Sequence, residues 1–292
     1  MTQTSSFVLP VDKPVGPTSH DVVAAARRAL KVRRIGHTGT LDPFASGLLL
    51  LCVGQATRIA EYLTDLPKTY RATMRLDGHT LTDDDTSEVV ERSEHWRALS
   101  PDQVLQALHA QVGTIMQLPP QYSAKKIAGE RAYDIARRGD VATLTPVAVQ
   151  VHDITTRRID LPNAEFDVTC SSGTYIRAIA RDVGAALGTG GYLTALRRIS
   201  IGAHAVADAV PLDELGAATR VAAAAMTPQQ ALAHMPAVDL TEEQTRAIRF
   251  GRPVEYGAHT EGLVQLLHAG TLIAIAKPEG GRLQPHKVFS DV

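Results

Sequence analysis

The feature that most constrains the fold is an unbroken apolar run, Leu48–Val53, between Gly47 and Gly54. A short apolar run bounded by turn residues is typical of a strand that is buried on both faces. Six residues are too few to cross a membrane, which takes about 20. Met1–Pro10 lacks a basic segment followed by an apolar core, so we expect no secretory signal. The sequence therefore predicts a cytoplasmic protein built around a buried strand.

The other predicted elements do not alternate regularly. Strand patterns occur at residues 7–11, 69–75 and 166–170, and helical patterns at residues 22–30, 101–112, 130–138, 174–187 and 192–198. Thr18 and Asp21 form a capping-box pattern before the first helix. Residues 77–94 are polar and acidic, which predicts a loop. Because strands and helices do not form a strand–helix–strand repeat, the order favours an α+β fold.

A domain boundary is predicted near Pro236. Residues 215–235 are rich in alanine, and beyond them the pattern changes to one small helix at 242–250 and short strands at 263–268 and 272–275. We therefore expect a large domain at residues 1–234 and a small, mainly β domain at 235–292.

Charge is unevenly distributed, although the formal net charge is only −1. Residues 1–75 carry net +5 and residues 119–200 net +3, whereas residues 76–118 carry net −6 and residues 201–292 net −3. The two basic blocks could hold a polyanion if folding brings them together. Charge alone leaves open the alternative that these side chains are scattered over solvated surfaces.

The glycine-rich segment 36–47 is a loop that matches no nucleotide-binding motif. It lacks the Gly-Lys-Ser/Thr of a P-loop and the G-x-G-x-x-G of a dinucleotide site. On composition alone, Asp42 followed by Pro43 is a turn dipeptide. His37 has no second ligand at metal-binding spacing, so we expect no metal.

Two other patterns are weak signals taken alone. Arg177 and Arg181 lie four residues apart and project from one helix face, where arginine can bind a carboxylate or a phosphate or can simply be solvated. Cys52 and Cys170 form no C-x-x-C pair, which favours two buried thiols.

Four motifs, taken in order, resemble those of one known family. They are Asp12-Lys13-Pro14-Val15-Gly16, Gly36-His37-Thr38-Gly39-Thr40-Leu41-Asp42-Pro43-Phe44-Ala45-Ser46-Gly47, Pro119-Pro120-Gln121-Tyr122-Ser123-Ala124-Lys125-Lys126 with Gly129-Glu130-Arg131-Ala132-Tyr133, and Cys170-Ser171-Ser172-Gly173-Thr174-Tyr175-Ile176-Arg177 with Leu196-Arg197-Arg198. On these motifs the chain is similar to the bacterial tRNA pseudouridine-55 synthases, the TruB family. The resemblance covers about residues 7–200, and the tail beyond about 205 is similar to small, PUA-like RNA-binding appendages.

The resemblance implies a fold and a set of site residues. The fold is a mixed, mainly antiparallel central sheet with flanking helices, with an RNA-clasping insertion at about residues 119–145. Asp42 is the implied catalytic carboxylate, Arg177 pairs with it, and Tyr70 stacks on the target base. The other residues that the resemblance places at the substrate are His37, Tyr175, Leu196, Lys13, Gly36, Thr38, Asp84, Lys125 and Lys126.

The chain departs from the family pattern at three places. Ser46 stands where threonine is usual, and Ser172 stands where lysine is usual, which removes one basic contact near the entrance. The acidic segment Asp83-Asp84-Asp85-Thr86 is shifted relative to the family pattern.

The implied activity is isomerisation of the T-loop uridine (uridine-55) of tRNA to pseudouridine. Because this reaction involves neither a redox change nor net hydrolysis, we expect no cofactor. Asp42 could attack the sugar, attack the base or remove a ribose proton, and the sequence leaves all three open. The expected partner is tRNA, with no membrane and no guide RNA, and the protein is expected to be a monomer.

Two other functions compete with this one. A tRNA-binding folding helper would need the basic blocks but not the whole set Asp42, Tyr70 and Arg177. A guide-RNA-directed synthase would have less need of the self-contained basic insertion.

Overall fold

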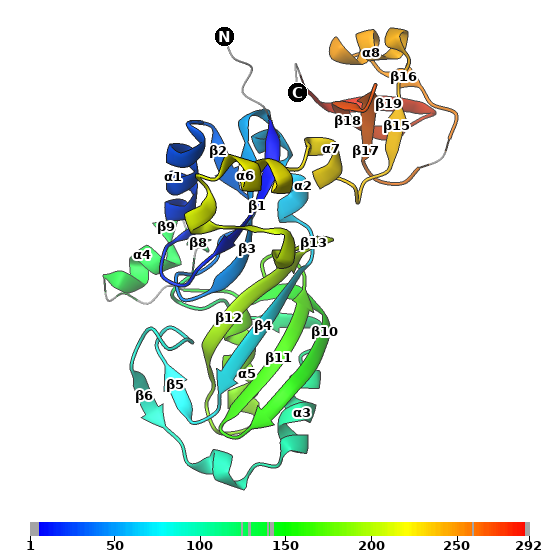
Figure 1. The fold of residues 1–292 in the computed structure, drawn as a ribbon. Helices are drawn as coiled ribbons and strands as arrows, with labels where there is room; N and C mark the ends of the chain where they lie inside the picture. The colour runs from blue at the N-terminus through cyan, green and yellow to red at the C-terminus, as the bar shows by residue number, and fades with distance from the viewer. Residues whose placement is uncertain are drawn as a thin grey trace.

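The computed structural model describes residues 6–123, 125–127, 130–138, 140, 143–258 and 260–289. Two large sheets dominate these residues, and Figure 1 shows them at opposite ends of the molecule. Short two-stranded ladders flank the larger sheet: β5 (Gly78–Thr80) with β6 (Val89–Arg92), and β8 (Lys126–Ile127) with β9 (Glu130–Arg131).

The larger sheet is mixed and mainly antiparallel, as predicted. Its strand order is β14-β1-β3-β12-β4-β11-β10-β7, with β2 on β3 and β13 on β12, and only β1–β14 and β3–β12 pair in parallel. The strands are β1 (Phe7–Lys13), β2 (Ile35–His37), β3 (Ser46–Val53), β4 (Lys68–Arg75), β7 (Gly113–Gln117), β10 (Val147–Asp160), β11 (Asn163–Cys170), β12 (Tyr192–Ile201), β13 (His204–Ala205) and β14 (Val210–Pro211).

The apolar run at 48–53 forms the buried strand that the sequence predicts. β3 lies between β1 and β12, and all six of these residues are 0% exposed. Leu48 and Leu50 pack into one core cluster, and Leu49 and Leu51 into another on the opposite face. Because apolar side chains cover both faces, the strand cannot show the alternation of a half-buried strand.

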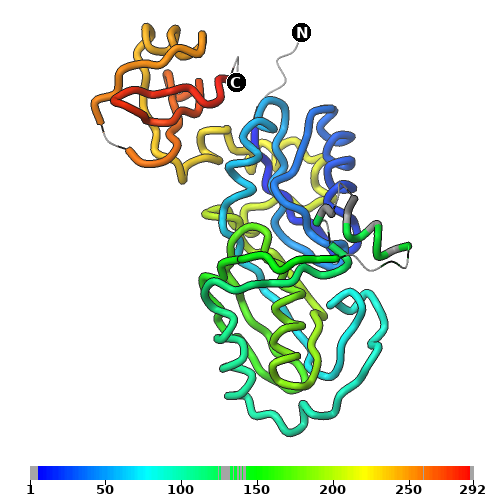
Figure 2. Tube along the Cα trace, turned by 180° about the vertical axis from the view of Figure 1, so that it is seen from behind, coloured from blue at the N-terminus to red at the C-terminus, as the bar shows by residue number. Residues whose placement is uncertain are grey.

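Helices cover the faces of this sheet. They are α1 (Ser19–Leu30), α2 (Ala60–Thr64), α3 (Pro101–His109), α4 (Ala132–Arg137), α5 (Ile176–Ala186), α6 (Ala218–Ala224) and α7 (Pro228–Ala231), with 3₁₀ turns at Gly54–Ile59, His95–Ala98, Val206–Asp208 and Leu212–Glu214. α3 and α5 lie side by side on one face, behind the sheet in Figure 1 and in front of it in Figure 2. Thr18 caps α1 and forms the predicted capping box with Asp21.

The predicted short helix at 192–198 is wrong, because these residues belong to strand β12. The register of β12 against β4 shifts between Leu193 and Ala195, which is a β-bulge. A bulge adds one residue and moves the following side chains to the other face. Leu193 and Leu196 are therefore both buried in the same cluster three residues apart, a spacing that mimics a helix.

The predicted loop at 77–94 is correct only in part. Residues 81–88 are loop, but β5 and β6 pair on either side of them. Both strands are short, and β6 is largely exposed, so neither produces a recognisable alternation.

The C-terminal residues form a separate five-stranded sheet in the order β15-β17-β18-β19-β16. Its elements are β15 (Ala237–Asp239), α8 (Glu242–Arg249), β16 (Val254–Glu255), β17 (Val264–His268), β18 (Thr271–Glu279) and β19 (Arg282–Val288). This sheet contacts the rest of the protein through Leu272, Ile275 and Phe289, which share a core cluster with Val8 and Leu48.

Phe289 is part of this contact, so removal of its side chain should lower the stability of the protein. The side chain is 3% exposed, and the guanidinium of Arg58 lies 5.0 Å from its ring centre. We expect Phe289→Ala to lower the free energy of unfolding by about 3 to 5 kcal/mol, because a buried phenylalanine is replaced by a cavity. Denaturant unfolding should show this loss. The control is Phe250→Ala, because Phe250 is 76% exposed. This substitution should lower the free energy of unfolding by less than about 0.5 kcal/mol. Equal losses in the two variants would contradict the stabilising role of Phe289.

Candidate active site

The loop that carries Asp42 connects β2 to β3, and backbone geometry fixes its path. Gly47 has a φ of +104°, and a Cβ at this position would lie 2.2 Å from the carbonyl oxygen of Arg198. Only glycine avoids this clash, so β3 can lie directly against β12. The register pairs Gly47 with Arg198, which places the Asp42 loop over the middle of the sheet.

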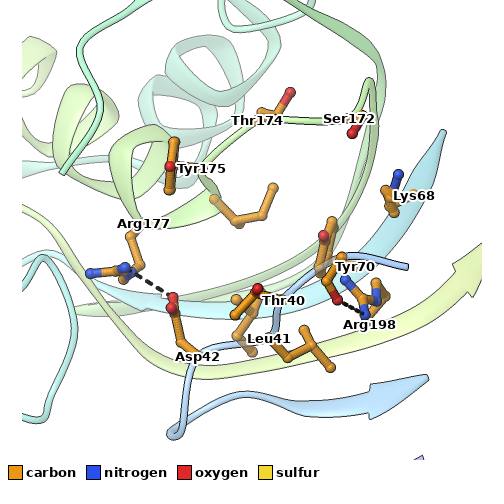
Figure 3. Close-up of a pocket in the computed structure, with 14 residues that line it drawn as sticks. Thr40, Leu41, Asp42, Lys68, Tyr70, Ser172, Thr174, Tyr175, Arg177 and Arg198 are labelled. Carbon is orange, nitrogen blue, oxygen red and sulfur yellow. Dashed lines mark hydrogen bonds and ion pairs between the residues drawn. The ribbon is translucent and has the colours of Figure 1, made fainter. Parts of the chain in front are cut away.

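Arg177 holds the Asp42 carboxylate. Its Nη2 lies 3.0 Å from Oδ2 of Asp42 (Figure 3). The Arg177 side chain is 4% exposed, whereas that of Asp42 is 37% exposed and accessible to a ligand. Arg177 also donates to the carbonyl oxygens of Thr82 (2.6 Å) and Tyr122 (2.8 Å). The guanidinium therefore joins the Asp42 loop, the residue just before the acidic segment and the start of the insertion.

Asp84 is the second carboxylate beside Arg177. Its Oδ2 lies 3.5 Å from Nη1 of Arg177, and its side chain is 5% exposed. Oδ1 accepts a hydrogen bond from the Thr82 hydroxyl (2.6 Å) and from the Thr86 amide (3.0 Å). This arrangement directs the carboxylate of Asp84 inward to Arg177 rather than outward to the surface.

A cavity of about 260 Å³ opens beside Asp42. This volume lies just below the usual range for drug-sized ligands and suits a small, flat group. Tyr70, Tyr175 and Leu196 form its apolar walls. Burial raises the pKa of both tyrosine hydroxyls, so both are neutral. The structure thus brings together Asp42, Arg177, Tyr70, Tyr175 and Leu196 at one pocket, as the resemblance implies.

Arg198 and Lys68 also line this pocket, and the sequence analysis did not single them out as site residues. Arg198 is 1% exposed, donates to the carbonyl oxygens of Leu48 (2.7 Å) and Gly39 (3.1 Å), and hydrogen-bonds the Tyr70 hydroxyl (Figure 3). Lys68 is 4% exposed. The available signal was their position in the sequence: Arg198 belongs to the motif Leu196-Arg197-Arg198, and Lys68 lies two residues before Tyr70.

Lys13 lies under the Asp42 loop instead of at the surface. Its ammonium donates to the carbonyl oxygens of Pro14 (2.9 Å), Pro17 (2.8 Å) and Pro43 (3.4 Å), and the side chain is fully buried. Burial lowers the pKa of Lys13 to about 8. Its contact with Pro43 ties β1 to the residue that follows Asp42.

The remaining predicted residues of the loop lie at its start. Gly36 and His37 belong to β2, and Thr38 is buried and donates its amide to the carbonyl of Leu50 (3.1 Å). The His37 ring meets that of His20 edge-on, with centroids 5.5 Å apart. Burial lowers the pKa of His37, which favours the neutral ring.

The insertion covers a second hollow on the other side of Asp42. This cavity of about 370 Å³ has Tyr122, Ser123 and Tyr133 on the insertion side and His20 near the start of α1. Asp42 and Arg177 line both hollows. Lys125 is exposed in this region. The side chain of Lys126 lies outside the described residues, and so does most of the stretch 139–142.

Among the described residues, no cluster of three or more histidine, cysteine, aspartate or glutamate side chains could bind a metal ion. None of the helices in these residues is long and apolar enough to cross a membrane.

Comparisons with known proteins match the sequence and the fold. The sequence models of three domains match: "TruB family pseudouridylate synthase (N terminal domain)" at residues 27–176, "tRNA pseudouridylate synthase B C-terminal domain" at 177–236 and "Pseudouridine synthase II TruB, C-terminal" at 236–289. A solved structure described as "Structure of H/ACA RNP bound to a substrate RNA containing 2'-deoxyuridine" is similar with a TM-score of 0.73 and 25% identity, over 97% of this chain and 85% of that one. The fold and the site therefore define a pseudouridine synthase.

Curated relatives narrow the class to a family. A "tRNA pseudouridine synthase B" of Thermobifida fusca is 43% identical, over 97% of this chain and 98% of that protein. One of Geobacter sulfurreducens is 40% identical over 93% of each. The chain belongs to the TruB family of pseudouridylate synthases.

Proposed function

We propose that this protein isomerises the T-loop uridine of tRNA, uridine-55, to pseudouridine, acting in the cytoplasm as a monomer without guide RNA or cofactor. The observation that carries the proposal is the Asp42 carboxylate, which Arg177 holds at 3.0 Å beside a small pocket walled by Tyr70. The relatives in Thermobifida fusca and Geobacter sulfurreducens bear the name of a tRNA-modifying enzyme, which supports tRNA as the substrate.

The uridine must leave the folded T-loop to reach this pocket. Extrusion of a stacked base costs a few kcal/mol. Stacking on the ring of Tyr70 recovers about 1 to 3 kcal/mol of this cost. Exposed cations such as Lys125 bind phosphates and orient the RNA without reading its sequence. We expect His37 and the insertion to contact the nucleotides around the extruded base.

Asp42 acts on the extruded nucleotide as a carboxylate. Arg177 holds this carboxylate in place, with Nη2 3.0 Å from Oδ2. Asp84 in turn keeps Arg177 in place from the other side. The geometry is compatible with attack on the sugar, attack on the base and removal of a ribose proton.

We propose a division of labour between the two sheets. Residues 1–234, with the insertion at about 119–145, form the catalytic domain. Residues 235–292 form a PUA-like appendage that adds RNA contacts, and the buried contact at Phe289 fixes it to the body.

Site mapping on a tRNA transcript tests the proposed substrate. The protein alone should convert one uridine, in the T-loop, and should convert none when that uridine is replaced by cytidine. A protein that converts a uridine only after a guide RNA is added is a guide-directed synthase. A protein that binds tRNA and converts nothing is the tRNA folding helper, and either result rejects the proposal.

Tyr70 should contribute through its ring. We expect Tyr70→Ala to lower the single-turnover rate about 5- to 150-fold, because stacking worth 1 to 3 kcal/mol is lost. Tyr70→Phe keeps the ring and loses only the hydroxyl that hydrogen-bonds Arg198, so its rate should stay within about tenfold of the native rate. Single-turnover assays with enzyme in excess measure both variants. Equal impairment of the two would show that the hydroxyl matters and that stacking does not.

A further inference from the structure

Lys68 is a buried pocket residue to which the proposed reaction assigns no task. It is the first residue of β4, and its side chain lies on the same face as that of Tyr70, two residues further on. It lines the cavity together with Asp42. Figure 3 shows Asp42 and Arg177 on one side of the pocket and Lys68 and Arg198 on the other.

The contacts of Lys68 include no ion pair among the described residues. Its ammonium donates to the carbonyl oxygens of Thr64 and Leu66, the latter at 2.6 Å. An ammonium has three N–H groups, so these two contacts leave one N–H for a ligand. Within the described ranges, no carboxylate lies within 4.0 Å of this nitrogen.

Arg198, which lines the same side of the pocket as Lys68, also donates to carbonyl oxygens and forms no described ion pair. Its guanidinium binds the carbonyl oxygens of Leu48 and Gly39 and the Tyr70 hydroxyl, and no described carboxylate forms an ion pair with it. The single carboxylate among the lining residues, Asp42, is paired with Arg177 at the other side. Burial of two cations that have no ion-pair partner costs free energy. A negative charge that enters the pocket offsets this cost.

The proposed reaction generates such a charge. When the bond between N1 and C1′ breaks, its electron pair stays on the base, which becomes a uracil monoanion with charge spread over N1, O2 and O4. In one alternative, C1′ forms a bond to the Asp42 carboxylate. In the other, the ribose loses a proton to that carboxylate and forms a double bond at C1′. The base then rejoins C1′ through C5, which displaces the Asp42 carboxylate or is accompanied by return of the proton from Asp42 to the ribose. The adduct finally loses its C5 proton and gains a proton at N1, which gives a neutral base.

We propose that Lys68 is a further catalytic residue: its ammonium, with Arg198 beside it, contacts the detached uracil and stabilises its negative charge. This inference rests on the proposed isomerisation. Cations placed where charge develops are worth more in a closed pocket than in water, since they need no reorganisation during the reaction. Ser172 lines the same pocket and carries no charge, so Lys68 and Arg198 supply the positive charge on this side.

Single-turnover rates of two Lys68 variants test the inference. We expect Lys68→Met to lower the rate about 100-fold, with little change in the affinity for tRNA, because a charge-stabilising donor is lost. Lys68→Arg keeps the cation and should recover the rate to within about tenfold. The control is Arg158→Met, which removes one charge on β10, outside the lining of the pocket, and should leave the rate unchanged.

The pH dependence separates a catalytic cation from a purely structural one. Burial lowers the pKa of Lys68 to about 8; Arg198 on β12 lowers it further, and Cys170 on β11 and Asp65 ahead of β4 raise it. The native rate should therefore fall as the pH rises above about 8, when Lys68 loses its proton. In Lys68→Arg this fall should vanish, because arginine stays protonated.

Three results would overturn the inference. The first is a Lys68→Met rate equal to the native rate. The second is a fall in the rate above pH 8 that persists in Lys68→Arg. The source of that fall would then be Lys13, whose pKa is also lowered to about 8. The third is a Lys68→Arg variant that stays folded in thermal unfolding but is as slow as Lys68→Met. A native protein that forms no pseudouridine would instead reject the proposed function itself.

Discussion

Asp42→Asn should abolish pseudouridine formation while the variant still binds tRNA. Asparagine has nearly the same shape as aspartate but can neither act as a nucleophile nor take a proton. We expect the single-turnover rate to fall about 10⁴-fold or more, which is the scale for loss of an essential base or nucleophile. Affinity for tRNA should change less than about threefold, because phosphate contacts dominate binding. Nucleoside analysis of digested tRNA measures the rate, and filter binding measures the affinity.

A matched control separates the loss of the reacting carboxylate from the loss of one negative charge. Asp167 is also a carboxylate held by arginines, with Arg71 at 2.8 Å, but it lies outside the pocket. Asp167→Asn should keep the native rate, although it removes the same charge. A rate of Asp42→Asn within about tenfold of the native rate would mean that another group performs the chemistry.

Arg177→Ala should cost both turnover and stability. The substitution leaves Asp84, whose side chain is 5% exposed, without its cation, and it frees the partly buried carbonyl oxygens of Thr82 and Tyr122. Removal of one partner from a buried ion pair costs about 3 to 5 kcal/mol, and denaturant unfolding should show such a loss. Turnover should be abolished because Asp42 loses the group that orients its carboxylate. The affinity for tRNA should remain close to native.

The neighbouring arginine on the same helix provides the control. Arg181 is 25% exposed and pairs with Asp83 and Asp182, away from Asp42. Arg181→Ala should therefore cost less stability and keep most of the activity. An Arg177→Ala variant with native single-turnover chemistry and a large loss of tRNA affinity would contradict the role of Arg177.

Local chemistry made parts of the fold predictable from the sequence. Leu48–Val53 is buried on both faces, and Thr18 with Asp21 forms the capping box, because these patterns depend on short stretches of chain. The bulge in β12 was not predictable in this way. It results from pairing with β4, a strand more than a hundred residues earlier, and it gives Leu193 and Leu196 a helical spacing.

The site could be predicted only in part. Asp42 and Arg177 are far apart in the chain, so spacing alone left Asp42 as a turn residue, and only the resemblance suggested that the two meet. For Lys13 the resemblance was a poorer guide. A basic residue in such a motif suggests contact with RNA. In the structure its ammonium lies beneath the loop, on the carbonyls of three prolines. Which carbonyls surround a cation depends on the tertiary path of the backbone, which no motif shows.

The most direct test of the central claim is tritium release from tRNA labelled at C5 of its uracils, with the protein as the only other component. Isomerisation replaces the C5–H bond by the bond to C1′, so the T-loop uridine must lose its label. The proposal predicts release of one C5 label per tRNA, that of the T-loop uridine. Tight binding of tRNA without any release would contradict the enzyme and favour the tRNA folding helper.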